Sequence, residues 1–310
     1  AKRSAAVMAM LREITPAVEQ ISIDEAFLDV TGCEALWGSV EQIARRIQSR
    51  VMDELSLPVS LGVASNKLVA KIACDVGKPQ GLVVVPQGQE AAFLAPLPIE
   101  RLWGVGRVTG ARLRALGIQT IGDLAHWDME ALERVLGQSG QALRAAAQGR
   151  DDSAVHEGHE RRSISQERTF AHDIAEAAEL RRTLLAMSDD LAARLRQQHL
   201  VAQGVRIKMR TPDFRTMTRQ VSLSQPTDQA GIIYQHAEEL LRRHWRVGQP
   251  LRLLGLAVSN LLDGAGYQLG LFSEQDRRNI RLSRTLDEIR ERFGPEAVTR
   301  ASLLRRRAGR

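Results

Sequence analysis

The sequence is poor in cysteine and in aromatic residues, and it has no long apolar run. Its two cysteines, Cys33 and Cys74, lack the paired spacing of a zinc site and are too few for a disulfide framework. Aromatic residues make up 4% of the chain, which argues against a binding surface built from stacked rings. No apolar stretch approaches the roughly 20 residues of a membrane span, and the first residues lead into an amphipathic helix rather than a signal peptide. We therefore expect a soluble, cytoplasmic protein that does not bind a membrane.

The positive charge is unevenly distributed along the 310 residues. Residues 1–155 contain 16 Lys and Arg against 18 Asp and Glu, whereas residues 156–310 contain 27 against 19. A basic half joined to a nearly neutral half indicates a polyanionic partner. Because no long basic amphipathic helix is present, nucleic acid is favoured over anionic lipid, with contacts to its backbone rather than to stacked bases.

Two adjacent carboxylates, Asp24 and Glu25, lie between two β-prone apolar runs, Val18 to Ile23 and Ala26 to Val30. The pattern predicts a hairpin with both acids at its tip. Two hard oxygen donors at one point suit Mg²⁺, which is usually held by one or two carboxylates, substrate phosphates and water. The alternative for any Asp-Glu pair is a solvated turn.

The first 86 residues alternate between predicted helices and strands. Helices are predicted over 5–13, from an N-cap at Ser39 to Leu55, and over 67–75; strands are predicted over 59–64 and 82–85. Together with the acidic hairpin, this order predicts a partial ferredoxin-like α+β domain over residues 1–86 that lacks its opening strand.

Residues 87–149 read as a small helical domain. The segment Gly104-Val105-Gly106, followed by a helix and by Thr120-Ile121-Gly122, has the pattern of a helix-hairpin-helix. In such a motif glycines allow a phosphate to approach the backbone, and N–H groups at a helix N-terminus bind the anion. A plain turn is the alternative, and the flanking helices favour phosphate binding.

After a polar linker over 150–161, residues 162–262 read as a second α+β domain, and residues 263–310 as a partly mobile tail with a helix over 280–292. In the predicted strand 205–210, Arg206, Lys208 and Arg210 alternate with apolar residues, so they share one face. Any half-exposed strand shows such alternation, but three cations in a row favour phosphate binding.

These motifs, in this order, resemble the Y-family translesion DNA polymerases of the bacterial DNA polymerase IV type over essentially the whole chain. The resemblance is carried by the residues 22–29 (Ser-Ile-Asp-Glu-Ala-Phe-Leu-Asp), by 62–73 (Gly-Val-Ala-Ser-Asn-Lys-Leu-Val-Ala-Lys-Ile-Ala), by Lys78-Pro79-Gln80-Gly81, by the helix-hairpin-helix, and by Arg162-Ser163-Ile164-Ser165 with Thr169-Phe170. It implies a palm over 1–86, a thumb over 87–149 and a basic little finger over 162–262.

The resemblance also implies roles for individual residues. Asp24 and Glu25 would be catalytic ligands of two Mg²⁺ ions, and Lys78, aided by Lys71, would contact the triphosphate of the incoming dNTP. Lys67 shares a helix face with Lys71 and would assist, unless these are solvated surface lysines. Primer-template DNA would be held through its backbone by six residues: Gly104, Gly106, Arg162, Arg206, Lys208 and Arg210.

The segment 268–272 is similar to the short peptide by which bacterial polymerases bind the sliding clamp, with Gln268, Leu269, Leu271 and Phe272 as contacts. Packing of this apolar run on its own domain is the alternative. The resemblance further implies that a first palm strand with another metal-binding aspartate, and the fingers, precede residue 1, so that the chain is an N-terminally truncated form.

We therefore predict a monomeric, low-fidelity, template-directed DNA polymerase acting in translesion synthesis and DNA repair. One alternative is a non-catalytic accessory protein, or an inactive truncated polymerase, that binds DNA and the clamp. Another is a generic helix-hairpin-helix DNA-binding module. That alternative leaves the acidic hairpin and the lysine-bearing helix unexplained.

Overall fold

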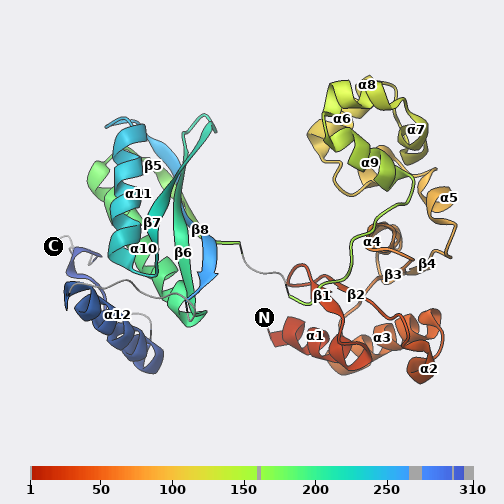
Figure 1. The fold of residues 1–310 in the computed structure, drawn as a ribbon, viewed down its shortest axis with the longest axis horizontal. Helices are drawn as coiled ribbons and strands as arrows, with labels where there is room; N and C mark the ends of the chain where they lie inside the picture. The colour runs from red at the N-terminus through yellow and green to blue at the C-terminus, as the bar shows by residue number, and fades with distance from the viewer. Residues whose placement is uncertain (1, 159–161, 265–273, 295–296, 304–310) are drawn as a thin grey trace. The chain divides into compact units, whose positions relative to one another are not determined.

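The structure is a computed structural model that describes residues 2–158, 162–264, 274–294 and 297–303 (Figure 1). The chain divides into two compact units, unit 1 (Ala1–His159) and unit 2 (Glu160–Arg310). Both combine helices with β-strands, which confirms the predicted α+β class. Among the described residues, no helix is both long and apolar enough to cross a bilayer.

The N-terminal part of unit 1 contains short strands packed against helices. Its elements are α1 (Lys2–Ile14), β1 (Val18–Gln20), β2 (Ala26–Leu28), α2 (Glu34–Trp37), α3 (Val40–Leu55), β3 (Leu61–Val63), α4 (Lys67–Val76) and β4 (Leu82–Val84). Strands β1 and β2 pair antiparallel, as the predicted hairpin requires, and β3 and β4 form a separate parallel pair. Helices α1 and α3 bury their apolar residues against β1, with Ile43 and Val51 almost fully buried.

Helix α3 begins where the sequence predicts. The Ser39 hydroxyl accepts a hydrogen bond from the backbone N–H of Gln42, and the Gln42 side chain accepts one from the backbone N–H of Ser39. This reciprocal capping box satisfies two of the N–H groups that a helix N-terminus leaves without partners. The predicted N-cap is therefore confirmed.

The second part of unit 1 is helical and shares a core with α4. It consists of α5 (Glu90–Leu94), the 3₁₀ helix η1 (Ile99–Arg101), α6 (Arg107–Ala115), α7 (Ile121–His126), α8 (Met129–Leu136) and α9 (Ser139–Ala147). Fully buried Leu113, Ile118 and Leu124 belong to the same apolar cluster as Val69 and Ile72 of α4. Helix α4 therefore joins the acidic hairpin region to the helical region.

The segment that follows α9 returns to the N-terminus of α4. The side chain of Asn66 donates to the backbone oxygen of Gly149 at 2.8 Å, and the backbone N–H of Leu68 donates to Asp151 Oδ2 at 3.0 Å. Asn66 is also the N-cap of α4, through a hydrogen bond from the N–H of Val69. Asp151 of the predicted linker and Gly149 just before it thus contact the start of a helix far earlier in the chain.

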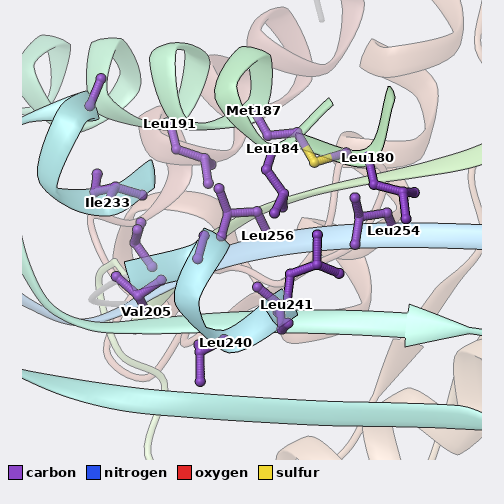
Figure 2. Close-up of a cluster of buried hydrophobic side chains, with 14 of the residues drawn as sticks. Leu180, Leu184, Met187, Leu191, Val205, Ile233, Leu240, Leu241, Leu254 and Leu256 are labelled. Carbon is purple, nitrogen blue, oxygen red and sulfur yellow. The ribbon is translucent and has the colours of Figure 1, made fainter. Parts of the chain in front are cut away.

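Unit 2 is a four-stranded antiparallel sheet with two helices on one face. Its elements are β5 (Ser163–Ile174), α10 (Ala177–Gln197), β6 (Leu200–Arg210), β7 (Thr216–Thr227), α11 (Ala230–His244), β8 (Leu251–Asp263), α12 (Glu274–Phe293) and the 3₁₀ helix η2 (Ala301–Leu303). The strand order is β5-β8-β6-β7, so β5 has β8 as its neighbour in the sheet. Figure 2 shows side chains of α10 and α11 filling the space over Val205, Leu254 and Leu256 of the sheet.

Helix α12 is longer than the predicted helix over 280–292 and is held to α10 by charged groups. Asp287 accepts two hydrogen bonds from the guanidinium of Arg196, at 2.5 and 3.0 Å. After α12, Arg300 donates to both carboxylate oxygens of Asp189, at 2.9 and 2.8 Å. A two-point pair between arginine and carboxylate, such as that of Arg196 and Asp287, fixes orientation as well as distance, so it helps to determine where α12 lies on unit 2.

The core of unit 2 yields a stability prediction. Leu256 in β8 is 1% exposed, and Leu256→Ala should lower the free energy of unfolding of unit 2 by about 2–5 kcal/mol, because the cavity cannot fully collapse. Hydrogen exchange of β6 and β8 peptides measures the change. Leu262→Ala in the same strand is the control, since Leu262 is 43% exposed and its truncation should change stability by less than about 0.5 kcal/mol. Equal exchange rates in the two variants would contradict the assigned core.

Candidate active site and nucleic-acid interface

The acidic hairpin presents Asp24 and Glu25 at its turn. Backbone N–H groups of Ile21 and Ser22 both donate to the Glu25 carbonyl, which closes the turn before β2 begins. The Ser22 hydroxyl donates to Asp24 Oδ1 at 2.5 Å, and the Asp24 side chain is exposed. The turn therefore holds one carboxylate in a defined orientation at the surface, next to a second, half-buried one.

Helix α4 brings cations to these acids. Lys71 Nζ lies 2.6 Å from Glu25 Oε1 and 3.5 Å from Asp75 Oδ2. Lys78, beyond the end of α4, lies 2.6 Å from Asp75 Oδ1. Glu25, Lys71, Asp75 and Lys78 thus form a chain of alternating charges, which we call the ion-pair chain. It joins three of the predicted site residues through Asp75, which the sequence analysis did not identify.

The groups of the ion-pair chain stabilise one another in their charged forms. Burial favours the neutral form of Lys71, but the hydrogen bond to Glu25 and the charge of Asp75 outweigh it and raise the Lys71 pKa above its usual value. Burial likewise favours neutral Asp75, and the Lys78 hydrogen bond with the Lys71 charge outweighs it and lowers the Asp75 pKa. The hydrogen bond to Asp75 raises the Lys78 pKa. Both lysines are therefore fully cationic at neutral pH.

Lys67 faces a different partner from Lys71, although the two are one helical turn apart. Its Nζ lies 2.8 Å from Glu19 Oε2 and over the Phe27 ring at 5.6 Å. Both charged side chains are buried, with 12% of Lys67 and 4% of Glu19 exposed. The backbone N–H of His156 donates to the same Glu19 oxygen at 3.1 Å. Lys67 therefore anchors the hairpin strand β1 to α4, and Glu19 anchors it to the segment that follows the helical region.

The side chains near the hairpin show which metal ligands the protein itself can supply at the predicted metal site. Within the described ranges, no three Asp, Glu, His or Cys side chains cluster closely enough to hold a metal ion by themselves. Asp24 and Glu25 supply two hard oxygen ligands, which fits Mg²⁺, since this ion commonly takes its remaining ligands from substrate phosphates and water. The residues present therefore fit a metal ion that binds together with a phosphate-bearing substrate.

The predicted helix-hairpin-helix glycines lie between η1 and α6. Gly104 adopts φ +95°, a conformation that side chains other than glycine rarely adopt, and Gly106 is the N-cap of α6. An added Cβ would meet no atom within 4 Å at Gly106 and only Leu143 at Gly104. The backbone at both positions is accordingly accessible, and the first N–H groups of α6 have no partner within the helix.

In unit 2, strand register places the basic residues of β6 in rows across the sheet. We call the face opposite α10 and α11 the outer face. From β5 to β7 its rows are Ser163-Ser259-Gly204-Ser222, Ser165-Ala257-Arg206-Gln220, Glu167-Gly255-Lys208-Thr218 and Thr169-Leu253-Arg210-Thr216. Arg206, Lys208 and Arg210 therefore share the outer face, whereas Arg162 precedes β5, outside these rows. Glu167 is the only acidic residue in the four rows, all of which the structure describes.

The side chains of β6 already have partners on this face. Arg206 donates twice to Gln220 Oε1, at 3.1 and 2.9 Å, and Arg210 donates to the Thr216 hydroxyl at 2.8 Å. Lys208 Nζ lies 2.9 and 3.0 Å from the two oxygens of Glu167. The predicted clamp contacts, Gln268, Leu269, Leu271 and Phe272, lie outside the described residues.

Three acidic residues that organise these sites were missed by the sequence analysis, namely Glu19, Asp75 and Glu167. Each pairs with a lysine of the predicted motifs or of the basic strand. The sequence signal for Asp75 is its spacing of four from Lys71 and three from Lys78. No local signal marks the other two, because their partners lie 48 and 41 residues away in the sequence.

Comparison with known proteins gives a consistent family. Models of the impB/mucB/samB family match residues 1–75, its HHH motif matches 88–118 and its C-terminal domain matches 161–271. The chain is 40% identical to a DNA polymerase IV of Desulfatibacillum aliphaticivorans, over 96% of this chain and 76% of the relative. It is 34% identical to DNA polymerase IV 1 of Bacillus subtilis, over 98% and 74%. A solved Y-family DNA polymerase chimera of Dbh and Dpo4 aligns with a TM-score of 0.74 at 26% identity, over 84% and 76%.

The buried pair of Lys67 and Glu19 predicts a large loss of stability. Glu19→Gln leaves a buried lysine without its counter-charge, so the free energy of unfolding of unit 1 should fall by about 3 kcal/mol. Chemical denaturation with hydrogen exchange of β1 and α4 peptides measures this.

Two further variants test the cause. Lys67→Met combined with Glu19→Gln should recover most of the lost stability, because the lysine charge is removed together with its counter-charge. Glu41→Gln, which removes an exposed pair with Arg45, should change stability by less than about 1 kcal/mol. A Glu19→Gln effect no larger than that of Glu41→Gln would show that the buried pair is not required.

Proposed function

Since the chain belongs to the Y-family of DNA polymerases, in the group of bacterial DNA polymerase IV, we propose how its residues carry out template-directed DNA synthesis. Its enzyme class is DNA-directed DNA polymerase of the translesion type, which acts on primer-template DNA and dNTPs with divalent metal ions. The ion-pair chain is the observation that supports the assignment of roles, because it joins a carboxylate of the hairpin to two lysines on one surface.

Asp24 and Glu25 would hold the divalent metal, in the form of two Mg²⁺ ions. Bound there, the metal would supply activation of the primer 3′-hydroxyl and stabilisation of charge on the leaving pyrophosphate. The hydrogen bond from Ser22 orients the Asp24 carboxylate, and the Lys71 contact orients that of Glu25. Both acids lie on a turn fixed by backbone hydrogen bonds to the Glu25 carbonyl, so little reorganisation is needed when substrate arrives.

Lys78 and Lys71 receive the triphosphate of the incoming dNTP. Lys78 is the more accessible, with 54% of its side chain exposed, and Asp75 holds it beside Lys71. Phosphate oxygens can replace the Asp75 and Glu25 carboxylates as partners of these ammonium groups. The lysines then neutralise charge that develops on the phosphates as the bond to the leaving group lengthens.

Primer-template DNA is held through its backbone at two places. The open backbone at Gly104 and Gly106 and the start of α6 bind a phosphate. Arg206, Lys208 and Arg210 on the outer face of unit 2, with Arg162 near β5, bind further phosphates. Contacts of this kind position the duplex without reading its sequence, which suits synthesis across damaged bases.

A clamp-binding role for Gln268, Leu269, Leu271 and Phe272 completes the proposal. It rests on the sequence alone, in which a glycine-rich turn precedes a polar residue and two spaced apolar anchors. We further propose that the polymerase acts as a monomer, tethered to the clamp by this peptide.

Removing the two carboxylates should abolish synthesis. Asp24→Asn combined with Glu25→Gln keeps side-chain shape but removes both negative charges, so primer extension should fall by at least about a hundredfold. The assay uses the 310-residue chain with primer-template DNA, dNTPs and Mg²⁺. Primer-template affinity, measured separately by fluorescence anisotropy, should not fall.

Asp29→Asn is the matched control, because Asp29 is an exposed carboxylate just after β2 whose side chain accepts from the backbone N–H of Thr31. Its activity should stay within about twofold of the parent. A parent chain that binds primer-template yet extends no primer, with or without the two acids, would instead support the non-catalytic accessory alternative.

Loss of the Lys78 charge should weaken use of the nucleotide. Lys78→Ala should lower kcat/KM for dNTP by about tenfold or more, which corresponds to at least ~1.4 kcal/mol. Steady-state single-nucleotide insertion measures it, with Lys78→Arg expected to retain more activity because its charge is kept. Lys2→Ala, an exposed lysine on α1, is the control. Equal kcat/KM for Lys78→Ala and Lys2→Ala would remove Lys78 from the triphosphate site.

A further inference from the structure

The pair formed by Glu167 and Lys208 differs from the other contacts on the outer face because it spans three strands. Glu167 in β5 and Lys208 in β6 are both opposite Gly255 of β8, which lies between them. Neighbouring strands are about 4.8 Å apart, so the two Cα atoms are separated by about 10 Å. The side chains therefore meet above the middle strand, with 2.9 and 3.0 Å between Lys208 Nζ and the two carboxylate oxygens.

Glycine at position 255 leaves room for this crossing. A Cβ added to Gly255 would lie 2.9 Å from Glu167 Cγ and 3.3 Å from Lys208 Cβ, closer than ordinary side-chain contacts allow. In the two neighbouring rows, β8 contributes Leu253 and Ala257 in place of glycine. Among the outer-face residues described, neither of these rows has an ion pair that crosses β8. The sequence thus has glycine, the smallest residue, at the position of β8 above which the side chains of Glu167 and Lys208 meet.

The negative charge of Glu167 matters for DNA binding because it lies among the cations of the outer face. The outer face carries three cations on β6, and Glu167 neutralises the central one, while Arg206 and Arg210 have uncharged partners. The pair is partly exposed, with 31% of Lys208 and 42% of Glu167 accessible, so a ligand can reach it. A carboxylate and a phosphate oxygen present the same kind of acceptor to an ammonium group.

We propose that Glu167 occupies the place of a DNA backbone phosphate at Lys208, and that duplex binding exchanges one partner for the other. This rests on the proposed role of the outer face in DNA binding. Glu167 thereby lowers the affinity of the outer face for DNA, because Lys208 must leave a formed ion pair and the carboxylate repels the incoming phosphate. Glu167 is thus an affinity-setting residue and not a DNA contact.

The test is a double-mutant cycle on the full chain, with binding of primer-template duplex followed by fluorescence anisotropy over a range of NaCl concentrations. Glu167→Gln should tighten binding by about fivefold. It should also increase the magnitude of the slope of log K against log salt by up to about one, the change expected for one additional phosphate contact. In a Lys208→Gln background the same change should tighten binding by only about twofold, because repulsion remains but no ion pair has to open.

Glu239→Gln is the matched control. Glu239 pairs with Arg243 at 2.5 Å on α11, which covers the opposite face of the sheet, and the substitution changes net charge by the same amount. It should change affinity by less than about 1.5-fold. Equal effects of Glu167→Gln and Glu239→Gln, or an equal gain from Glu167→Gln whether Lys208 is present or replaced, would overturn partner exchange. A parent chain that shows no salt-dependent duplex binding would instead overturn the proposed DNA role of the outer face.

Discussion

The buried ion pair between Lys67 and Glu19 fixes the geometry of unit 1 around the acidic hairpin. It joins α4 to β1, and the same carboxylate accepts the amide of His156, so three segments distant in sequence meet at one point. Removing two charges from water is unfavourable unless both remain paired, so neither element can shift alone. Because α4 carries Lys71 and β1 leads into the acidic turn, this pair sets the separation between the proposed metal ligands and the proposed triphosphate lysines.

The same electrostatic arrangement occurs separately in each of the two units. Lys71 and Lys78 share Asp75, and Lys208 is paired with Glu167. Each of these lysines is proposed to meet a phosphate, and each already has a carboxylate beside it. Binding then replaces one anion by another instead of capturing a phosphate on an unpaired cation. Such replacement gains less free energy, but it keeps the site ordered before the ligand arrives.

Local patterns in the sequence were sufficient to predict several of the longer elements and the order of the motifs. The Ser39 N-cap, the hairpin around Asp24 and Glu25 and the alternating bases of β6 are all read from residues a few positions apart. Partners distant in sequence were not predictable in this way. The alternation of β6 indicated which residues share a face, but only the strand order β5-β8-β6-β7 brings an acid of β5 to a base of β6. Family resemblance supplied roles that neither pattern nor spacing gives.

The strand order of unit 2 also has a consequence for biosynthesis. Strand β5 is made first, yet its neighbour in the sheet is β8, the last strand of the sheet to be translated. The hydrogen-bonding edge of β5 therefore stays unpaired while α10, β6, β7 and α11 are translated. Pairs of strands so far apart in sequence form slowly, and an unpaired strand edge is prone to aggregation. Nascent unit 2 therefore carries an unpaired β5 edge until β8 has been translated.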